Sequence, residues 1–448
     1  MPSGPFPSRP PGPPGRPLVG HLPEFGRDTL GFVERAAREH GDVVRFRLGG
    51  WEAWLVSRPD LVERVLVQGY RDFVKHRFFW RHVGAIFGAG LLTNEGDAWL
   101  HQRRLVQPAF HHERVRRYGE VMIEKTRDRL ATWRDGEVRD VRAEMTSLTF
   151  EIVAKVLFDA EVAADVQETA DAFDTGIDEI ARRFRRPFRI PDAVPTPGNR
   201  RYLRAVARMD ALIYRMIDEH CAGAAGGDDL LTTLLEARDE SGAPMPLRQV
   251  RDEVITLLLA GHETTALALT WTWWLLSEHP DADARLAAEA RHVFGDRPPE
   301  VADLPRLEWA ERVAKESMRL RPPAYSFGRE ALDACELDGW RAPAGTTLFV
   351  FPWLLHRDER WFPDPAAFRP ERWTADMEAE LPRCAYLPFG AGPRICVGRG
   401  FAMMELGLIL ATIARDWRLE WEGGPPTPFP SITLRPTGSL SARLERRA

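Results

Sequence analysis

The hydrophobic pattern divides the chain into a long helical part and a shorter part with β-like segments. Apolar positions with helical spacing run from 98 to 279, interrupted by a proline-rich segment at 186–199 and a glycine-rich segment at 223–229. After Arg321-Pro322-Pro323 the pattern changes to short apolar stretches between prolines and glycines, which lie at 336–341, 346–351, 432–435 and 439–444. We therefore expect a mainly α fold with small β-sheets.

Near the start of the chain, two short segments predict a β-hairpin. Segments 43–48 and 51–56 alternate apolar and polar residues in part, and a pair of glycines separates them. Pro59 then indicates the first turn of a helix that continues to about Val67.

The longest helical segment lies between Pro246 and Pro280. Its 33 residues, 247–279, would extend roughly 50 Å at about 1.5 Å per residue, enough to cross the whole molecule. The stretch 254–276 is apolar enough to resemble a membrane span, but Glu263 near its middle would cost about 2.5–3.5 kcal/mol in a bilayer. We therefore expect a buried central helix and no membrane span.

Composition and charge restrict the class of protein. The chain has 448 residues, 44% hydrophobic and 28% charged, and its net charge of −5 argues against a nucleic-acid-binding protein. Four scattered cysteines do not form a disulfide framework, so we expect reduced thiols in a cytoplasmic protein. Without repeats or long linkers, 1–448 reads as one domain. The Pro/Gly-rich extension at 1–17 resembles neither a signal peptide nor an anchor.

The strongest candidate for chemistry is segment 389–398, Phe-Gly-Ala-Gly-Pro-Arg-Ile-Cys-Val-Gly. Its glycines allow the backbone to approach a ligand, Arg394 stands two residues before Cys396, and an apolar helical stretch follows at 401–414. A thiolate just before a helix is stabilised by the helix dipole and by free N–H groups, which also suit a metal-bound sulfur. A cysteine alone is more often a small apolar side chain. A phosphate loop is excluded because no Lys-Ser/Thr pair follows.

A second candidate lies in the middle of the central helix, at 260–265 (Ala-Gly-His-Glu-Thr-Thr). Ala260 and Gly261 remove side-chain volume, so that a flat ligand could approach the helix there. Thr264 beside that gap can bond to a backbone carbonyl or to a ligand. Burial of Glu263 would raise its pKa and suit it to relay protons. In the alternative interpretation, Thr264 only bends the helix and Glu263 belongs to a structural ion pair.

Together, the two motifs resemble the haem-binding loop and the acid–alcohol pair of the cytochrome P450 family. The resemblance implies that Cys396 ligates the iron of haem b, and that the haem lies between the central helix and the helix after the Cys396 loop. In that family the pair corresponding to Glu263 and Thr264 delivers protons as O2 is cleaved, while the thiolate pushes electron density onto the iron. Further cofactor contacts are implied for Ala260, Gly261, Phe389, Arg394 and Gly398.

Two more groups of residues match the family in the same order along the chain. Glu316 and Arg319 lie three apart on one helix face and, with Arg372, resemble the Glu-x-x-Arg plus Arg network that supports the haem loop. We expect these three to be structural rather than catalytic. Haem carries two propionates, which suit fork-shaped arginine donors. The residues expected to reach them are Trp99, Arg103, Arg329 and Arg394.

The resemblance also implies where a substrate pocket lies. The segments that line it in the family are rich here in apolar and aromatic residues, so a lipophilic substrate such as a terpenoid, fatty acid or polyketide-like molecule is expected, with hydroxylation or epoxidation as the reaction. The expected pocket residues are Phe79, Phe87, Phe184, Leu259, Ala324, Tyr325, Phe327 and Ile432, with Phe78, Trp80, Ile86 and Phe188 nearby. An arginine group at 182–186 suits a carboxylate, although a solvated face is the simpler interpretation.

Electrons are expected from separate chains, a ferredoxin and its reductase, because no reductase sequence follows the C-terminal hairpin. A positive face could receive an acidic donor; its expected residues are Arg103, Arg104, Arg114, Arg116, Arg117 and Arg399. The protein is expected to be a monomer. Two alternatives stay open: a haem-thiolate sensor, and an enzyme of the same fold that uses peroxide or needs no reductant. Retention of Glu263 and Thr264 argues against both.

Overall fold

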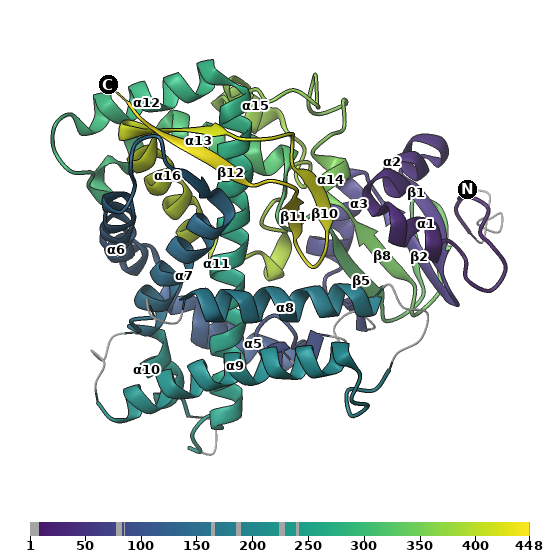
Figure 1. Ribbon diagram of the computed structural model, residues 1–448. Coiled ribbons are helices and arrows are strands. Elements are labelled where there is room, and N and C mark those ends of the chain that lie inside the picture. Colours follow the sequence, from purple (N-terminus) through teal and green to yellow (C-terminus); the bar gives the residue numbers. More distant parts are fainter. Residues whose placement is uncertain are drawn as a thin grey trace.

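The computed structural model describes residues 9–77, 83–84, 86–162, 166–184, 190–223, 229–238 and 242–447. The helices are α1 (Leu22–Arg27), α2 (Thr29–His40), α3 (Pro59–Glu63), α5 (Gly96–Val106), α6 (His112–Ala131), α7 (Val141–Phe158), α8 (Val166–Phe184), α9 (Pro197–Cys221), α10 (Leu230–Glu236), α11 (Leu247–Glu278), α12 (Pro280–Phe294), α13 (Glu308–Leu320), α14 (Pro352–Leu355), α15 (Ala375–Glu380) and α16 (Arg399–Asp416). The mainly helical prediction is confirmed (Figure 1).

The strands are short. They are β1 (Val43–Leu48), β2 (Trp51–Val56), β3 (Phe73–Lys75), β4 (Val138–Asp140), β5 (Phe327–Ala331), β6 (Cys335–Leu337), β7 (Trp340–Ala342), β8 (Thr347–Val350), β9 (Trp417–Trp421), β10 (Thr427–Pro430), β11 (Leu434–Thr437) and β12 (Ser441–Arg446). They form a five-stranded sheet in the order β1-β2-β8-β5-β3, a three-stranded sheet β4-β12-β9, and the pairs β10-β11 and β6-β7.

Helix α11 runs through the centre of the molecule and confirms the predicted central helix (Figure 1). It is 32 residues long, mostly apolar and buried along most of its length, and a helix of that kind is stable in water only when other elements cover it. It is also long and apolar enough to cross a membrane, but 83% of its most apolar window is buried inside the protein. We therefore interpret α11 as a core helix.

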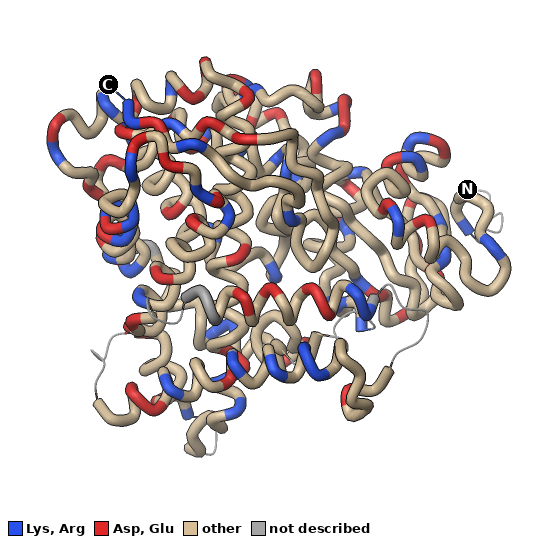
Figure 2. The backbone as a smooth tube through the Cα atoms, viewed as in Figure 1, with Lys and Arg blue, Asp and Glu red and all other residues tan. Residues whose placement is uncertain are grey.

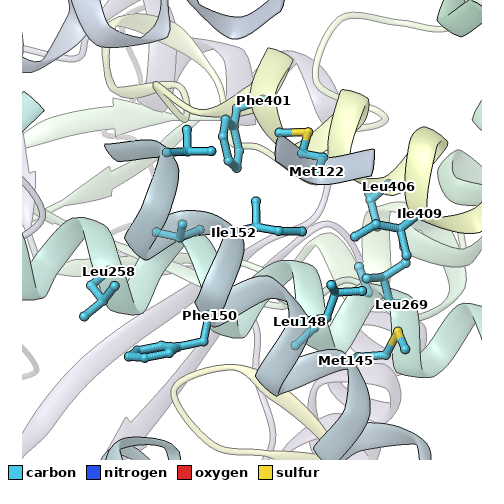
Figure 3. Close-up of a cluster of buried hydrophobic side chains, with 14 of the residues drawn as sticks. Met122, Met145, Leu148, Phe150, Ile152, Leu258, Leu269, Phe401, Leu406 and Ile409 are labelled. Atoms are coloured by element: carbon cyan, nitrogen blue, oxygen red, sulfur yellow. The ribbon is translucent and has the colours of Figure 1, made fainter. Parts of the chain in front are cut away.

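Charged residues of both signs are interspersed over the outer helices and loops (Figure 2). The apolar core beneath them joins α6, α7, α11 and α16, and its side chains meet between these helices (Figure 3). The residues labelled there are Met122, Met145, Leu148, Phe150, Ile152, Leu258, Leu269, Phe401, Leu406 and Ile409. This packing fixes α16, which directly follows the Cys396 loop, relative to the middle of α11.

The predicted hairpin at 43–56 is confirmed by antiparallel pairing of β1 and β2, with Val43 opposite Val56. Helix α3 begins at Pro59 as predicted and passes into a π-helical turn, Arg64–Gln68. The described part of the N-terminal extension lies against the first strand, because the Arg45 N–H donates to the Pro11 carbonyl at 2.8 Å.

All four predicted β-like segments contain strands, although 336–341 forms two, β6 and β7, joined by a turn. The pattern did not predict β3, β4, β5, β9 or β10. Strands β3 and β4 have only three residues each, and β4 is mostly exposed. Segments of three residues are too short to show an alternating pattern, and their pairing partners hold them in place.

Candidate active site around Cys396

The Cys396 loop depends on glycine for its shape. Gly390 and Gly392 have φ values of 72° and 71°, a region that residues with side chains rarely adopt. A Cβ atom on Gly392 would also collide with the Leu66 carbonyl oxygen. The Cys396 N–H donates to the Phe389 carbonyl at 2.9 Å and closes the loop three residues before α16. Phe389 therefore contributes a backbone acceptor to the loop.

The Cys396 sulfur lies deep in the protein and yet borders open space. Burial raises the pKa of the Cys396 thiol, while an N–H bond from Gly398 and the charge of Arg103 oppose that rise. The residue is nevertheless exposed to solvent. A side chain that is deeply placed and yet exposed faces an internal opening. A ligand that displaced water from this opening could bind the sulfur.

Helix α11 borders an opening at the expected place. Ala260 is exposed and Thr264 half-exposed, whereas 24 other residues of this helix are buried. An exposed alanine in the middle of a core helix requires space beside it, as expected for a flat ligand. Gly261 has a second role: a Cβ atom there would lie 3.0 Å from Val153 of α7, so glycine allows the two helices to pack closely.

A group of buried cations lies beside the loop. Lys75 of β3 is paired in register with Arg329 of β5, and Arg394 of the loop interacts electrostatically with both. Glu95 forms an ion pair with Arg394 and accepts the Lys75 N–H at 2.8 Å. Burial lowers the pKa of Arg329 to about 10 and lowers that of Lys75 well below its usual value.

Two arginines and a lysine against one carboxylate leave an excess of positive charge among these described residues, of one unit from the arginines and a second when Lys75 is protonated. Isolated buried charges are unfavourable, and an anionic ligand with two carboxylates would compensate them. The two propionates of haem fit this requirement. Lys75 was missed from the sequence because a lysine in an unrecognised three-residue strand gives no signal.

Trp99 and Arg103 of α5 hold the cation group and the loop. The Arg394 guanidinium stacks over the Trp99 ring at 4.1 Å, which fixes its position by a cation–π contact. Arg103 donates to the Ile395 carbonyl at 2.9 Å, next to Cys396. Arg103 of α5 therefore contacts the backbone of the cysteine loop, and its contact with a propionate stays a prediction.

Glu316, Arg319 and Arg372 are brought together in a buried network. Both nitrogens of an Arg319 fork lie 2.9 Å from the Glu316 carboxylate, and Arg372 Nε lies 3.1 Å from it. Trp373 Nε1 donates to the same carboxylate at 3.0 Å. Arg319 is fully buried and also donates to three backbone carbonyls, those of His356, Pro365 and Ala367. This geometry suits a support for the chain that leads to the Cys396 loop.

The acid–alcohol residues differ from the simplest expectation. The Thr264 hydroxyl donates to the Ala260 carbonyl at 2.7 Å. Glu263 is buried, but it is not isolated in an apolar helix: it forms an ion pair with Arg435 of β11 at 2.5 Å and accepts from Thr433 at 3.0 Å. The alternative interpretation, an ion pair at Glu263, is therefore what the structure contains. Arg435 compensates the charge of this carboxylate, and the role of Glu263 as a proton relay stays a prediction.

Of the expected pocket residues, Phe79 and its neighbours Phe78, Trp80 and Phe188 lie outside the described residues, as does the Phe184 side chain. Phe87 and Leu259 are buried in the main core, and Ile432 packs against that core. Tyr325 is tied to the C-terminal hairpin, because its hydroxyl donates to the Ser431 carbonyl at 2.7 Å. Phe327 lies beside Gly390 of the loop. Ala324 is half-buried.

Comparison with known proteins agrees with this geometry. The sequence model of the family described as Cytochrome P450 matches residues 10–441. The chain is 40% identical to cyclooctatin synthase of Streptomyces melanosporofaciens over 96% of this chain and 93% of that protein. It is 38% identical to cyclooctat-9-en-7-ol 5-monooxygenase of the same organism, over 93% of this chain and 89% of that protein. It is 34% identical to pentalenene oxygenase of Streptomyces avermitilis, over 96% and 94% of the two chains.

Proposed function

The chain belongs to the cytochrome P450 family and is a monooxygenase, and on that premise we propose that it inserts one oxygen atom of O2 into a terpenoid. The family's cofactor is haem b and its co-substrate is O2. The main support for the site is Cys396, a deeply placed thiol that still borders open space.

The residues present fit haem b. Cys396 would supply the sulfur ligand, and the Gly398 N–H that already bonds this sulfur would stabilise it as a thiolate. Lys75, Arg329 and Arg394 would bind the two propionates, whose negative charge would compensate the positive excess of this group. Ala260 leaves room beside the central helix.

Haem bound through a cysteine thiolate supplies the reductive activation of O2. The protein has to exclude water and deliver protons. Burial of Leu259 and Phe87 keeps the surroundings apolar. The Thr264 oxygen keeps lone pairs free to accept a hydrogen bond from water, since its own hydrogen is directed to the Ala260 carbonyl. Glu263 is the adjacent carboxylate that can return a proton to that threonine.

Two observations support a terpenoid substrate. Three relatives that match nearly the whole chain carry names of terpenoid biosynthesis, two of which state the compound oxidised, cyclooctat-9-en-7-ol and pentalenene. The described pocket residues are apolar apart from the Tyr325 hydroxyl, which is already bonded to the protein. A pocket of this kind binds a hydrocarbon skeleton by shape and apolar contact.

We further propose a separate ferredoxin and ferredoxin reductase as the source of electrons. Arg104, Arg116 and Arg399 are exposed on the elements that flank the Cys396 loop, and could receive an acidic donor. We place the enzyme in the cytoplasm as a soluble monomer, since its cysteines are free and its apolar central helix is buried.

The proposal is tested by product analysis with the holoenzyme. Pentalenene and cyclooctat-9-en-7-ol are the first probe compounds, followed by a panel of cyclic terpenes, each supplied with NADH, a surrogate ferredoxin and its reductase. We expect a hydroxylated product that carries one atom from isotopically labelled O2. Product formed with peroxide alone, and none with the reduced partners, would favour the peroxide-using alternative. Binding of haem without turnover of any terpene would contradict the proposed substrate class.

A further inference from the structure

Arg435 is the main partner of the Glu263 carboxylate. Its Nε and Nη2 lie 2.9 and 2.5 Å from Glu263 Oε1, and Thr433 donates to the same oxygen at 3.0 Å. Among the described residues, none donates a hydrogen bond to Oε2. The carboxylate is therefore fixed through one oxygen, and the other remains available to water.

The same guanidinium is shared with two carboxylates of α8. Arg435 Nη2 lies 3.1 Å from Asp174 and Nη1 lies 3.4 Å from Asp178. These aspartates are four residues apart, so they share one face of α8, whose acidic positions recur along the helix in Figure 2. Asp174 also accepts from Arg142 of α7 at 2.7 Å. Arg435 thus connects α8, α11 and β11.

Arg435 stands on a firmly held strand. Trp271 Nε1 of α11 donates to the Leu434 carbonyl at 3.0 Å, and the Leu434 N–H donates to the Pro323 carbonyl at 2.9 Å. Tyr325 binds the same hairpin through Ser431. Because these hydrogen bonds fix the backbone next to Arg435, its guanidinium can hold the Glu263 carboxylate in one position.

We propose that Arg435 is the positioning residue of Glu263, and that the acidic face of α8, formed by Asp174 and Asp178, sets how firmly Arg435 holds that carboxylate. The contacts stand independently of the proposed function, and only the use of Glu263 as a proton carrier rests on it.

Each charged group that faces Glu263 among the described residues acts in a defined direction. Arg435 favours the ionised carboxylate, whereas Asp174 and Asp178 oppose ionisation and compete for the guanidinium. Arg142 reduces the competition from Asp174. Burial lowers the pKa of His262, the neighbour on α11, so this imidazole is neutral near pH 7. Burial also lowers the pKa of Arg435, but Glu263 and Asp174 outweigh it and the guanidinium stays charged.

The test is pH-difference infrared spectroscopy of the holoenzyme, which detects the C=O band of a protonated carboxyl group. The band of Glu263 is identified by its loss in Glu263→Gln. In Arg435→Gln we expect the titration midpoint of this band to move up by about one to three pH units, because an opposite charge at this distance has been removed. Arg435→Lys should recover most of the shift, and Asp178→Asn should move the midpoint down.

Arg142→Gln is the matched control, since it removes the same charge without touching Glu263. We expect it to raise the midpoint less than Arg435→Gln does. A midpoint unchanged in Arg435→Gln, or a shift equal in both variants, would overturn the proposal. If Arg435→Gln does not fold, Asp174→Asn and Asp178→Asn decide the question from α8, and unchanged midpoints in both would overturn it.

A second measurement shows whether positioning matters for the reaction. The fraction of NADH-derived electrons released as hydrogen peroxide should rise at least several-fold in Arg435→Gln and return toward wild type in Arg435→Lys. An unchanged fraction would contradict a role in proton delivery. Failure of the proposed function is recognised separately, because it would appear as absent terpene turnover by the wild-type holoenzyme, while the infrared midpoints of that holoenzyme would still report on Arg435.

Discussion

At the scale of single residues, the buried cations beside the Cys396 loop have the most specific consequence. Arg329 is surrounded by protein, interacts with Arg394 and Lys75, and donates one hydrogen bond to the Gly328 carbonyl. A doubly negative cofactor edge would convert this unfavourable group into a set of charge-assisted hydrogen bonds. Arg329 is therefore expected to bind the cofactor rather than to stabilise the fold alone.

We expect Arg329→Met to weaken haem retention by about 2 kcal/mol, roughly 30-fold, because one charge-assisted hydrogen-bonding partner is lost. The measurement is the rate of haem transfer to apomyoglobin. Lys125→Met serves as the control and should leave the rate unchanged. Lys125 lies near the C-terminal end of α6, where it forms an exposed ion pair with Glu161. Equal rates in the two variants would contradict the assignment.

Single residues also show where sequence analysis succeeds and where it cannot. Cys396, Gly392 and Arg394 lie in one short segment, so their pattern predicted the loop directly. Arg435 contacts the Glu263 carboxylate, which is 172 residues away in sequence. The segment around Arg435 has an ordinary strand pattern that gives no sign of this contact. The sequence predicted Glu263 as a site residue, but the charge state of its surroundings depends on β11 and α8, which only the folded chain brings together.

At the scale of elements, the packing of α16 against α11 buries the carboxyl group of Glu405. Burial raises the pKa of the Glu405 carboxyl to about 8, although the nearby Thr265 hydroxyl acts in the opposite direction. In the unfolded chain this group titrates near 4.5. Between these values the folded protein binds a proton that the unfolded chain has released, so stability falls as pH rises, by up to about 1.4 kcal/mol per pH unit.

Glu405→Gln should remove this dependence. We expect the Tm of the variant to rise relative to wild type as pH increases from about 5 to 8, and the difference to level off above that range. Calorimetry on both holoenzymes measures it, with the exposed Glu380→Gln as the control. A constant difference across the range would show that Glu405 does not hold its proton in the folded protein.

Helix α13 supplies the second prediction at this scale, through the buried network of Glu316, Arg319 and Arg372. Arg319→Ala leaves the Glu316 carboxylate buried beside Trp373 without its main partner, which costs roughly 3–5 kcal/mol. We expect a lower Tm and a smaller fraction of haem-loaded protein. Arg312→Ala on the same helix removes a looser pair, 3.7 Å from Glu308, and should change neither. Normal stability and haem content in Arg319→Ala would refute the structural role.

At the scale of the whole molecule, the central helix and the mainly α architecture followed from the sequence because long periodic stretches carry strong signals. Strands of three residues such as β3 and β4 carry almost none, and their positions depend on pairing partners. The opening beside Ala260 could be anticipated only as a lack of side-chain volume. The structure adds that the opening lies beside α11, and that this helix is buried along most of its remaining surface.

The molecule as a whole also has to receive electrons. If a separate acidic ferredoxin binds near the exposed Arg104 and Arg116, its rate of reduction of the enzyme should fall at least several-fold from low to high ionic strength. Stopped-flow reduction measures this rate. Arg104→Glu combined with Arg116→Glu should slow reduction at low salt, whereas Arg27→Glu on α1 should not. Rates independent of salt would contradict this docking face.

The most direct test concerns the ligand of the iron. The purified protein, reduced and saturated with carbon monoxide, should show the red-shifted Soret band of thiolate-ligated haem, and Cys396→Ser should abolish that band. Cys221→Ser, at an exposed cysteine of α9, should retain it. A Soret band at the position of imidazole-ligated haem, protein without pigment, or an unchanged band in Cys396→Ser would contradict the account.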